Sequence, residues 1–151
     1  QPIYSYCKNM DGLRGEVVER VRRFIVGYLA AHVDPSDPFG STGRAYVRLA
    51  GEEPHLFRIF ILHKRKGISS LDELYRRETD AHMAKTIADR LQIGLSEAKE
   101  LHLHMLIYTI GVGTIFSVTT PGIPVEEIDR QQQKAYEAFV RGLSKEKTDE
   151  R

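Results

Sequence analysis

The fold is decided by one stretch, residues 101–118, which reads LHLHMLIYTIGVGTIFSV. It is shorter than the roughly 20 apolar residues that a membrane-spanning helix needs. His104 lies inside it and His102 lies near its start. A helix that is apolar on most of its sides in a soluble protein is a buried helix. We therefore expect residues 101–118 to form a core helix.

The segments around this stretch also have the helical period, and almost none shows the strict alternation of a half-buried strand. Proline, glycine and capping serines divide the chain into expected helices. Their approximate ranges are 11–32, 41–51, 54–64, 70–91, 96–119 and 125–143. The sequence therefore predicts an all-α fold, an antiparallel bundle of about six helices.

The amino-acid composition limits the classes of function that the protein can have. The 151 residues carry 22 Lys and Arg against 21 Asp and Glu, a net charge of +1, so no overall basic field attracts nucleic acid. A single cysteine excludes an internal disulfide framework, and no apolar leader or lipidation signal is visible. We expect a single-domain, cytoplasmic protein that does not enter a membrane.

The expected helix over residues 70–92 changes character along one face. Leu71, Tyr75, Glu78 and His82 follow at steps of four, three and four residues, which keeps them on one line. Polar groups on an inward face need partners. Either these groups pair with each other, or they bind a molecule that enters the core.

Other residues offer an apolar wall to such a molecule. They are Phe57, Phe60, Ile61, Met83, Met105 and Tyr108. Taken singly, each is better explained as an ordinary core residue than as a ligand contact. His104 lies one turn before Tyr108 and is a candidate hydrogen-bond partner for a ligand.

Gly111 and Gly113 lie inside the expected core helix. Glycine in a helix interior costs about 1 kcal/mol relative to alanine and commonly marks a close approach of backbones. The approach is to a second subunit, to another helix of the same chain, or to neither if the helix bends there.

Metal and enzyme chemistry find little support in the sequence. The histidines show no HExxH spacing, and the one cysteine has no CxxC partner. Glu78 and His82 are spaced to share a ligand, but the same spacing suits a hydrogen-bonded pair. A nucleophile elbow, a phosphate-binding glycine loop and a dinucleotide fingerprint are all missing. We expect no metal, no cofactor and no enzyme activity.

Residues 2–13 read PIYSYCKNMDGL. This run resembles the end of the helix-turn-helix in TetR-family transcriptional regulators, although Cys7 and Met10 depart from the usual pattern. The resemblance implies that Tyr4 and Lys8 contact DNA phosphates. It also implies that residues 1–10 are the remnant of a DNA-binding domain whose greater part is missing from this chain, and that residues 11–151 form an effector-binding and dimerisation domain.

Two further regions are similar to the effector domain of the same family. Residues 45–60 contain a tyrosine helix, an acidic turn and a Pro-x-Leu-Phe helix start. Residues 104–139 contain a glycine-bearing helix, a Pro-Gly turn and a helix with Tyr136 and Phe139. The resemblance implies a homodimer through the last two helices, with interface residues Gly111, Gly113, Ile128, Tyr136 and Phe139.

The resemblance also implies a small, mostly apolar effector bound in a helical cavity. The residues expected to contact it are Phe57, Phe60, Ile61, Tyr75, Glu78, His82, Met83, His104, Met105 and Tyr108. In this reading the parent protein binds operator DNA as a repressor, and the effector changes the spacing of its DNA-binding heads. The alternative is a constitutive helical dimerisation module without a physiological ligand.

Overall fold

The computed structural model describes residues 10–120 and 122–149, and every regular element in these ranges is an α-helix. The all-α prediction is confirmed. The helices are α1 (Met10–His32), α2 (Pro38–Glu52), α3 (Pro54–Leu62), α4 (Leu71–Glu78), α5 (Ala81–Leu91), α6 (Leu95–Phe116) and α7 (Val125–Asp149). None of the helices in the described part of the chain is long and apolar enough to cross a lipid bilayer.

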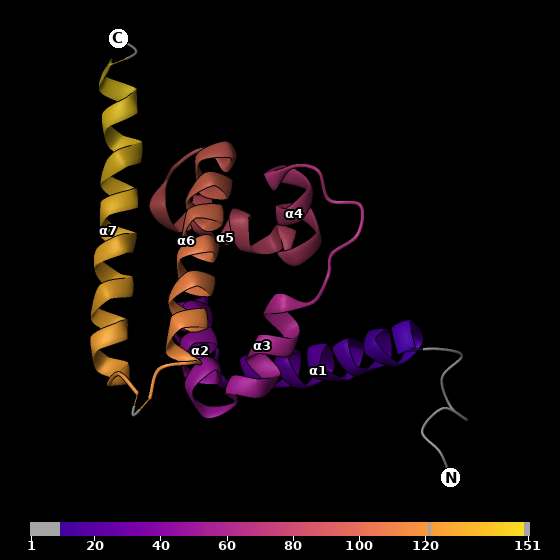
Figure 1. Ribbon diagram of the computed structural model, residues 1–151. Helices are drawn as coiled ribbons and strands as arrows, with labels where there is room; N and C mark the ends of the chain where they lie inside the picture. The colour runs from indigo at the N-terminus through magenta and orange to yellow at the C-terminus, as the bar shows by residue number, and fades with distance from the viewer. Residues whose placement is uncertain (1–9, 121, 150–151) are drawn as a thin grey trace.

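Helix α6 is the centre of the arrangement. It packs against α2, α5 and α7, and it runs antiparallel beside α7 (Figure 1). Helix α1 packs on α2 and α3 and extends away from the α6–α7 pair (Figure 1). One face of α6 is buried, through Ala98, Leu101, Met105, Thr109 and Gly113. The prediction that residues 101–118 lie in a core helix is therefore confirmed for one face of that helix as far as Phe116, where α6 ends.

The helix predicted over residues 70–91 is wrong in one respect, because the chain breaks it into α4 and α5. Thr79 has extended backbone angles, and its hydroxyl donates to the carbonyl of Tyr75 at 2.6 Å. Asp80 then caps α5, since its side chain accepts a hydrogen bond from the backbone N–H of His82. Aspartate is among the preferred residues at this position. The break takes His82 off the line of Tyr75 and Glu78.

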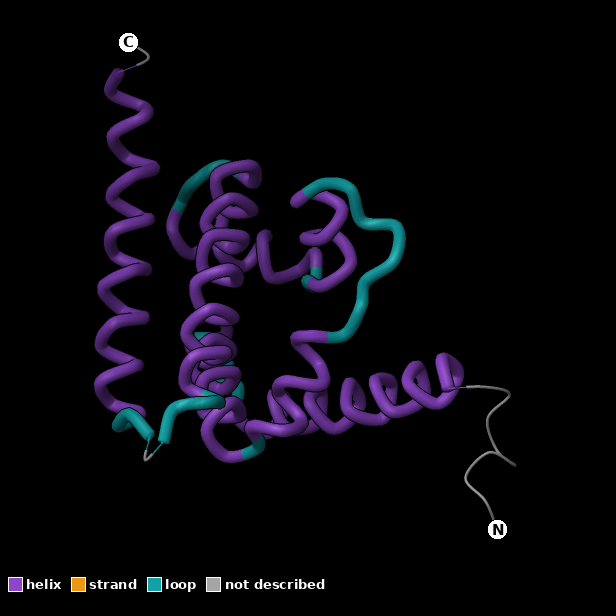
Figure 2. The backbone as a smooth tube through the Cα atoms, in the orientation of Figure 1, coloured by secondary structure: helices purple, strands orange, loops and turns teal. Residues whose placement is uncertain are grey.

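A long loop joins α3 to α4 and curves outward between them (Figure 2). Arg65 fixes this loop. Its Nε donates to Glu78 Oε1 at 3.1 Å, and its Nη1 donates to the carbonyl oxygens of Ile61 and His63. The position of α4 therefore depends on a partly buried ion pair as well as on apolar packing.

The core consists of two clusters. We call the first the filled cluster; it lies among α1, α2 and α3 and comprises Val21, Ile25, Leu49, Ala50, Phe57, Phe60 and Ile61. We call the second the cavity cluster; it joins α5 to α6 and comprises Ile87, Ala98, Leu101 and Met105, with α7 side chains packed against it.

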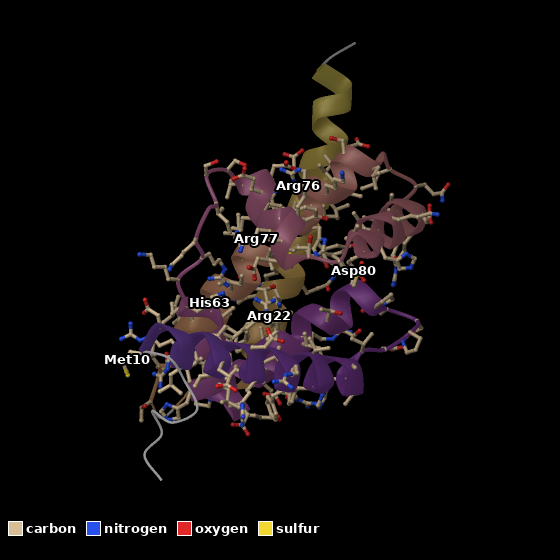
Figure 3. All side chains as sticks on the ribbon, turned by 90° about the vertical axis from the view of Figure 1, so that its right-hand side faces the viewer. Met10, Arg22, His63, Arg76, Arg77 and Asp80 are labelled. Carbon is tan, nitrogen blue, oxygen red and sulfur yellow. The ribbon has the colours of Figure 1, made fainter. Side chains whose placement is uncertain are left out.

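The filled cluster is covered on its outer side by a cation. The guanidinium carbon of Arg22 lies 5.3 Å from the ring centroid of Phe60, within the range of a cation–π contact. Figure 3 shows Arg22 on α1 and His63 beyond the end of α3 on this side of the molecule, with Arg76 and Arg77 above them on α4.

Candidate ligand cavity

A cavity of about 260 Å³ lies among α2, α5, α6 and α7. It is partly open to solvent, and its wall is mostly apolar. The apolar side chains in the wall are Phe39, Met83, Ile87, Leu91, Met105 and Leu106. Ligand pockets commonly measure about 300–1,000 Å³. This volume is close to the lower end of that range and suits a small molecule.

One end of the cavity is polar and comes from α7 and α6. Gln132 is only 5% exposed, and its Nε2 donates to Thr109 Oγ1 at 2.9 Å. Gln132 Oε1 and Asp129 Oδ1 are buried and have no hydrogen-bond partner among the described residues. Both residues line the cavity. Two hydrogen-bond acceptors therefore stand at this end without a donor from the described chain.

Gly43 on α2 makes room for this polar end. A β-carbon at Gly43 would lie 3.2 Å from Gln132 Nε2, which is tighter than ordinary van der Waals contact. The absence of a side chain at Gly43 thus lets α2 and α7 approach each other at Gln132.

The open side of the cavity carries an ion-pair cluster. Asp37 Oδ2 accepts from Arg44 Nη2 at 2.9 Å, and Asp37 Oδ1 accepts from Arg90 Nη1 at 2.9 Å. Arg90 also donates to the carbonyl of Ser36. This cluster ties the start of α2 to α5. Both arginines are partly exposed, so the cluster stabilises the structure weakly.

A tyrosine–histidine pair lies on the side of the cavity that faces α4. The hydroxyl of Tyr75 and Nδ1 of His102 share a hydrogen bond of 2.9 Å, and the rings of Phe39 and His102 meet edge to face. Burial lowers the pKa of His102 to about 4, against a smaller opposing effect of Asp80. His102 is therefore a neutral imidazole at neutral pH.

Burial also perturbs the acid at the polar end. The pKa of the Asp129 carboxyl is raised, mainly because burial disfavours its charged form, while Arg44 and Arg48 act in the opposite direction.

The structure brings few of the predicted ligand residues together. Met83 and Met105 line the cavity, and Tyr75 reaches it through its hydrogen bond to His102. Phe57, Phe60 and Ile61 belong to the filled cluster instead. They are neighbours of one another and do not border the cavity.

The remaining predicted ligand residues have other surroundings. Glu78 is paired with Arg65, and His82 is exposed. The ring of His104 lies 5.1 Å from that of Phe139, and Tyr108 is half-buried outside the cavity wall.

The residues predicted for a dimer interface divide into two groups. Gly111 is exposed and has no neighbour within 4 Å of where its β-carbon would be. At Gly113 a β-carbon would lie 2.6 Å from Phe57 Cζ, so the close approach is to another helix of the same chain. Ile128 is buried, and Tyr136 and Phe139 pack against the cavity cluster. A dimer contact stays a prediction for all five.

The polar end of the cavity was missed in the sequence. A signal for it exists, because Gln132 lies four residues after Ile128 and four before Tyr136, on the apolar line of the last helix. A glutamine on such a line is an inward polar group in need of a partner. Arg90 and Asp37 gave no comparable signal, since their pairing depends on how α2 and α5 meet.

The DNA-contact residues predicted at Tyr4 and Lys8 lie outside the described residues. Comparisons with protein-family models, with curated proteins and with solved structures find no match. The resemblance to TetR-family regulators therefore stays a prediction based on the sequence.

Proposed function

We propose that this chain is the effector-binding and dimerisation part of a TetR-like, ligand-responsive transcriptional regulator, with a small, mostly apolar effector bound in the cavity. The observation that carries the proposal is the cavity of about 260 Å³, with an apolar wall and unpartnered polar groups at one end. Binding sites for small molecules have this composition. Repression released by the effector is the response we propose.

The helix arrangement supports a route from the cavity to α1. Helix α2 borders the cavity and also packs against α1. A ligand that favours one position of α2 would shift α1, which extends away from the bundle (Figure 1). Such a ligand changes the population of two packings only by its difference in affinity for them. In the parent protein, this shift would change the spacing of two DNA-binding heads.

An exposed apolar stripe on α6 supports the proposed homodimer. Ile107 is 48% exposed and Ile115 is 61% exposed, with the exposed Gly111 between them. The spacing of four residues places all three on one face of the helix. Gly111 carries no side chain there, which permits close approach of a second α6. We propose this stripe as the centre of the interface.

Thermal unfolding against a panel of small apolar compounds tests the effector proposal. A compound present at about 100 times its dissociation constant stabilises the native state by about 2.7 kcal/mol, which raises the midpoint by roughly 5–10 °C in a domain of this size. The variant Leu106→Trp places a larger side chain in the cavity wall and should abolish the shift. Leu62→Trp, at an exposed position, is the matched control. A panel without any concentration-dependent shift would favour the constitutive module instead.

Sedimentation tests the dimer. The double variant Ile107→Glu/Ile115→Glu should convert a dimer to monomers at micromolar concentration, because two like charges per subunit would meet in the interface. Val26→Glu adds a charge at an exposed apolar residue of α1 and should leave the dimer intact. A wild-type protein that sediments only as a monomer would contradict the proposed interface.

A further inference from the structure

The polar end of the cavity points to a chemical class of ligand. We propose that Gln132 and Asp129 bind a neutral, hydrogen-bond-donating head group, best matched by a primary carboxamide, on an otherwise apolar molecule. This inference rests on the proposed effector function and adds the head group that the cavity selects.

The first step concerns the acceptors. Gln132 is 95% buried, its Nε2 is used by Thr109, and its Oε1 has no partner in the described ranges. Asp129 Oδ1, one turn earlier on α7, is also buried and has no hydrogen-bond partner in the described ranges. A buried polar atom without a partner costs about 1–3 kcal/mol. Both atoms are covered in the empty cavity, so a ligand removes this cost when a small shift of these side chains brings its N–H or O–H donors within hydrogen-bond distance.

The second step excludes a negatively charged head group. An anion would bring further acceptors to a place that already holds two. The two arginines that line the cavity, Arg44 and Arg90, are both engaged by Asp37 at 2.9 Å. Recognition of an anion would require these ion pairs to break.

The third step disfavours a cationic head group. Arg44 and Arg48 act electrostatically on Asp129 in the direction that lowers its pKa, and Glu126 has a smaller effect in the opposite direction. An ammonium group at Asp129 would be repelled by both guanidinium groups. It would also lose its hydration in a partly enclosed apolar cavity, at a cost that a single carboxylate repays poorly. A neutral donor avoids both penalties.

The fourth step selects among neutral donors. A primary carboxamide has two N–H donors, which equals the two acceptors, Gln132 Oε1 and Asp129 Oδ1. Its carbonyl oxygen can accept from the hydroxyl of Thr109, which has no acceptor among the described residues and whose oxygen already accepts from Gln132. Met83, Ile87 and other apolar side chains of the wall then enclose the rest of the ligand.

Three probes with the same phenylethyl body separate the possibilities. Hydrocinnamamide carries a carboxamide, benzylacetone replaces the NH₂ of that group by CH₃, and hydrocinnamate carries a carboxylate. Isothermal titration of the whole chain measures each dissociation constant. We expect the amide to bind at least about tenfold more tightly than the ketone, because the ketone leaves the buried acceptors unpaired. Hydrocinnamate should bind most weakly.

Two variants assign the effect to the named residues. Gln132→Met keeps a side chain of similar length and removes the acceptor, so the advantage of the amide over the ketone should fall to about twofold or less. Asp129→Leu removes the other acceptor and should reduce the same ratio in part. The ratio within one variant is the readout, so a general loss of stability in Gln132→Met does not mimic the result.

Three outcomes would overturn the inference. Equal affinity for the amide and the ketone would show that donors are not selected. Tightest binding of hydrocinnamate would place an anion site at Arg44 and Arg90. In both of these cases the cavity still binds ligands, and the proposed function stands. Absence of binding by all three probes would defeat the head-group inference and the effector proposal together.

Discussion

Helix α6 packs against the filled cluster at one end and supplies residues of the cavity cluster at the other. At the Gly113 end, the ring of Phe57 lies where a side chain of α6 would otherwise be, and the space between α3 and α6 is occupied. At the Met105 end, α2, α5, α6 and α7 surround a cavity of about 260 Å³. One helix therefore has a tightly packed contact at one end and a hollow at the other.

The difference lies in the side chains. The filled cluster is built from aromatic and branched residues that exclude water, whereas the cavity wall combines methionines with polar groups such as Gln132 and Thr109. Methionine is unbranched and polarisable, so it adapts to differently shaped neighbours. The comparison indicates a closely packed part formed with α1 and α3, and a part with free space formed with α5 and α7.

The largest expected effect comes from emptying the filled cluster. Phe57 is fully buried, so Phe57→Ala should lower the free energy of unfolding by about 3–5 kcal/mol. Met83 is half-buried beside existing free space, so Met83→Ala should cost less than about 2 kcal/mol. Urea unfolding of both variants measures the difference. Equal losses would mean that the two clusters are packed alike.

The second effect is a pH dependence of stability that comes from the cavity half. His102 has an ordinary pKa of 6.5, lowered by burial to about 4 in the folded chain. The imidazole of His102 therefore binds a proton more readily in the unfolded chain than in the folded chain. Protonation does not reduce the free energy of unfolding above pH 6.5, and it reduces it progressively as the pH falls from 6.5 toward 4. A shift of this size corresponds to a loss on the order of 3 kcal/mol.

The variant His102→Asn isolates this effect. Its side-chain amide can form a hydrogen bond with the hydroxyl of Tyr75, as Nδ1 of His102 does, but it does not titrate. Unfolding curves between neutral and acidic pH should show a shallower decline for His102→Asn than for wild type. Parallel declines would contradict a buried neutral imidazole.

The third effect compares two glycines of α6. Gly113→Ala would place a methyl group 2.6 Å from Phe57 Cζ and should destabilise the protein by about 1–3 kcal/mol. Gly111→Ala meets nothing within 4 Å and should stabilise the helix by about 0.5–1 kcal/mol in the monomer. Thermal midpoints of the pair, read at a concentration where the protein is monomeric, give opposite signs if the account is right. A loss at both positions would contradict it.

The smallest effect concerns α4, which is linked to the cavity wall by the hydrogen bond between Tyr75 and His102. The side chain of Ser70 accepts a hydrogen bond from the backbone N–H of Glu73 and begins α4, which carries Tyr75. Ser70→Ala should cost about 1 kcal/mol. Hydrogen exchange should rise in α4 and stay unchanged in α1. Faster exchange throughout the chain would show that α4 does not open independently.

Much of the fold could be predicted from the helical periodicity of apolar residues and from the proline, glycine and capping residues between the helices. Pro54 and Ser70 start helices where the sequence predicted starts, and residues 101–116 lie in the central helix. The break at Thr79 and Asp80 was missed because both residues are tolerated inside a helix. The capping hydrogen bond of Asp80, which starts α5, depends on local backbone angles that the sequence does not specify.

The site was harder to predict than the fold. Met83 and Met105 were expected at a cavity and line one, but Phe57 was assigned to the same wall and packs against Gly113 instead. Helical spacing fixes which residues share a face of one helix. It does not fix which neighbouring helix meets that face, and this choice decided whether each aromatic residue entered the filled cluster or the cavity.

The chain's three methionines provide the most direct test of the central claim, which is that the cavity is a ligand site. Met83 and Met105 line it, whereas Met10 is exposed at the start of α1. With ¹³C-labelled methionine methyl groups, titration with hydrocinnamamide and benzylacetone can be followed by NMR at each site. The account predicts saturable shifts at Met83 and Met105 with at least one probe, and none at Met10. Unchanged signals at Met83 and Met105 with both probes, or equal non-saturating shifts at all three methionines, would contradict it.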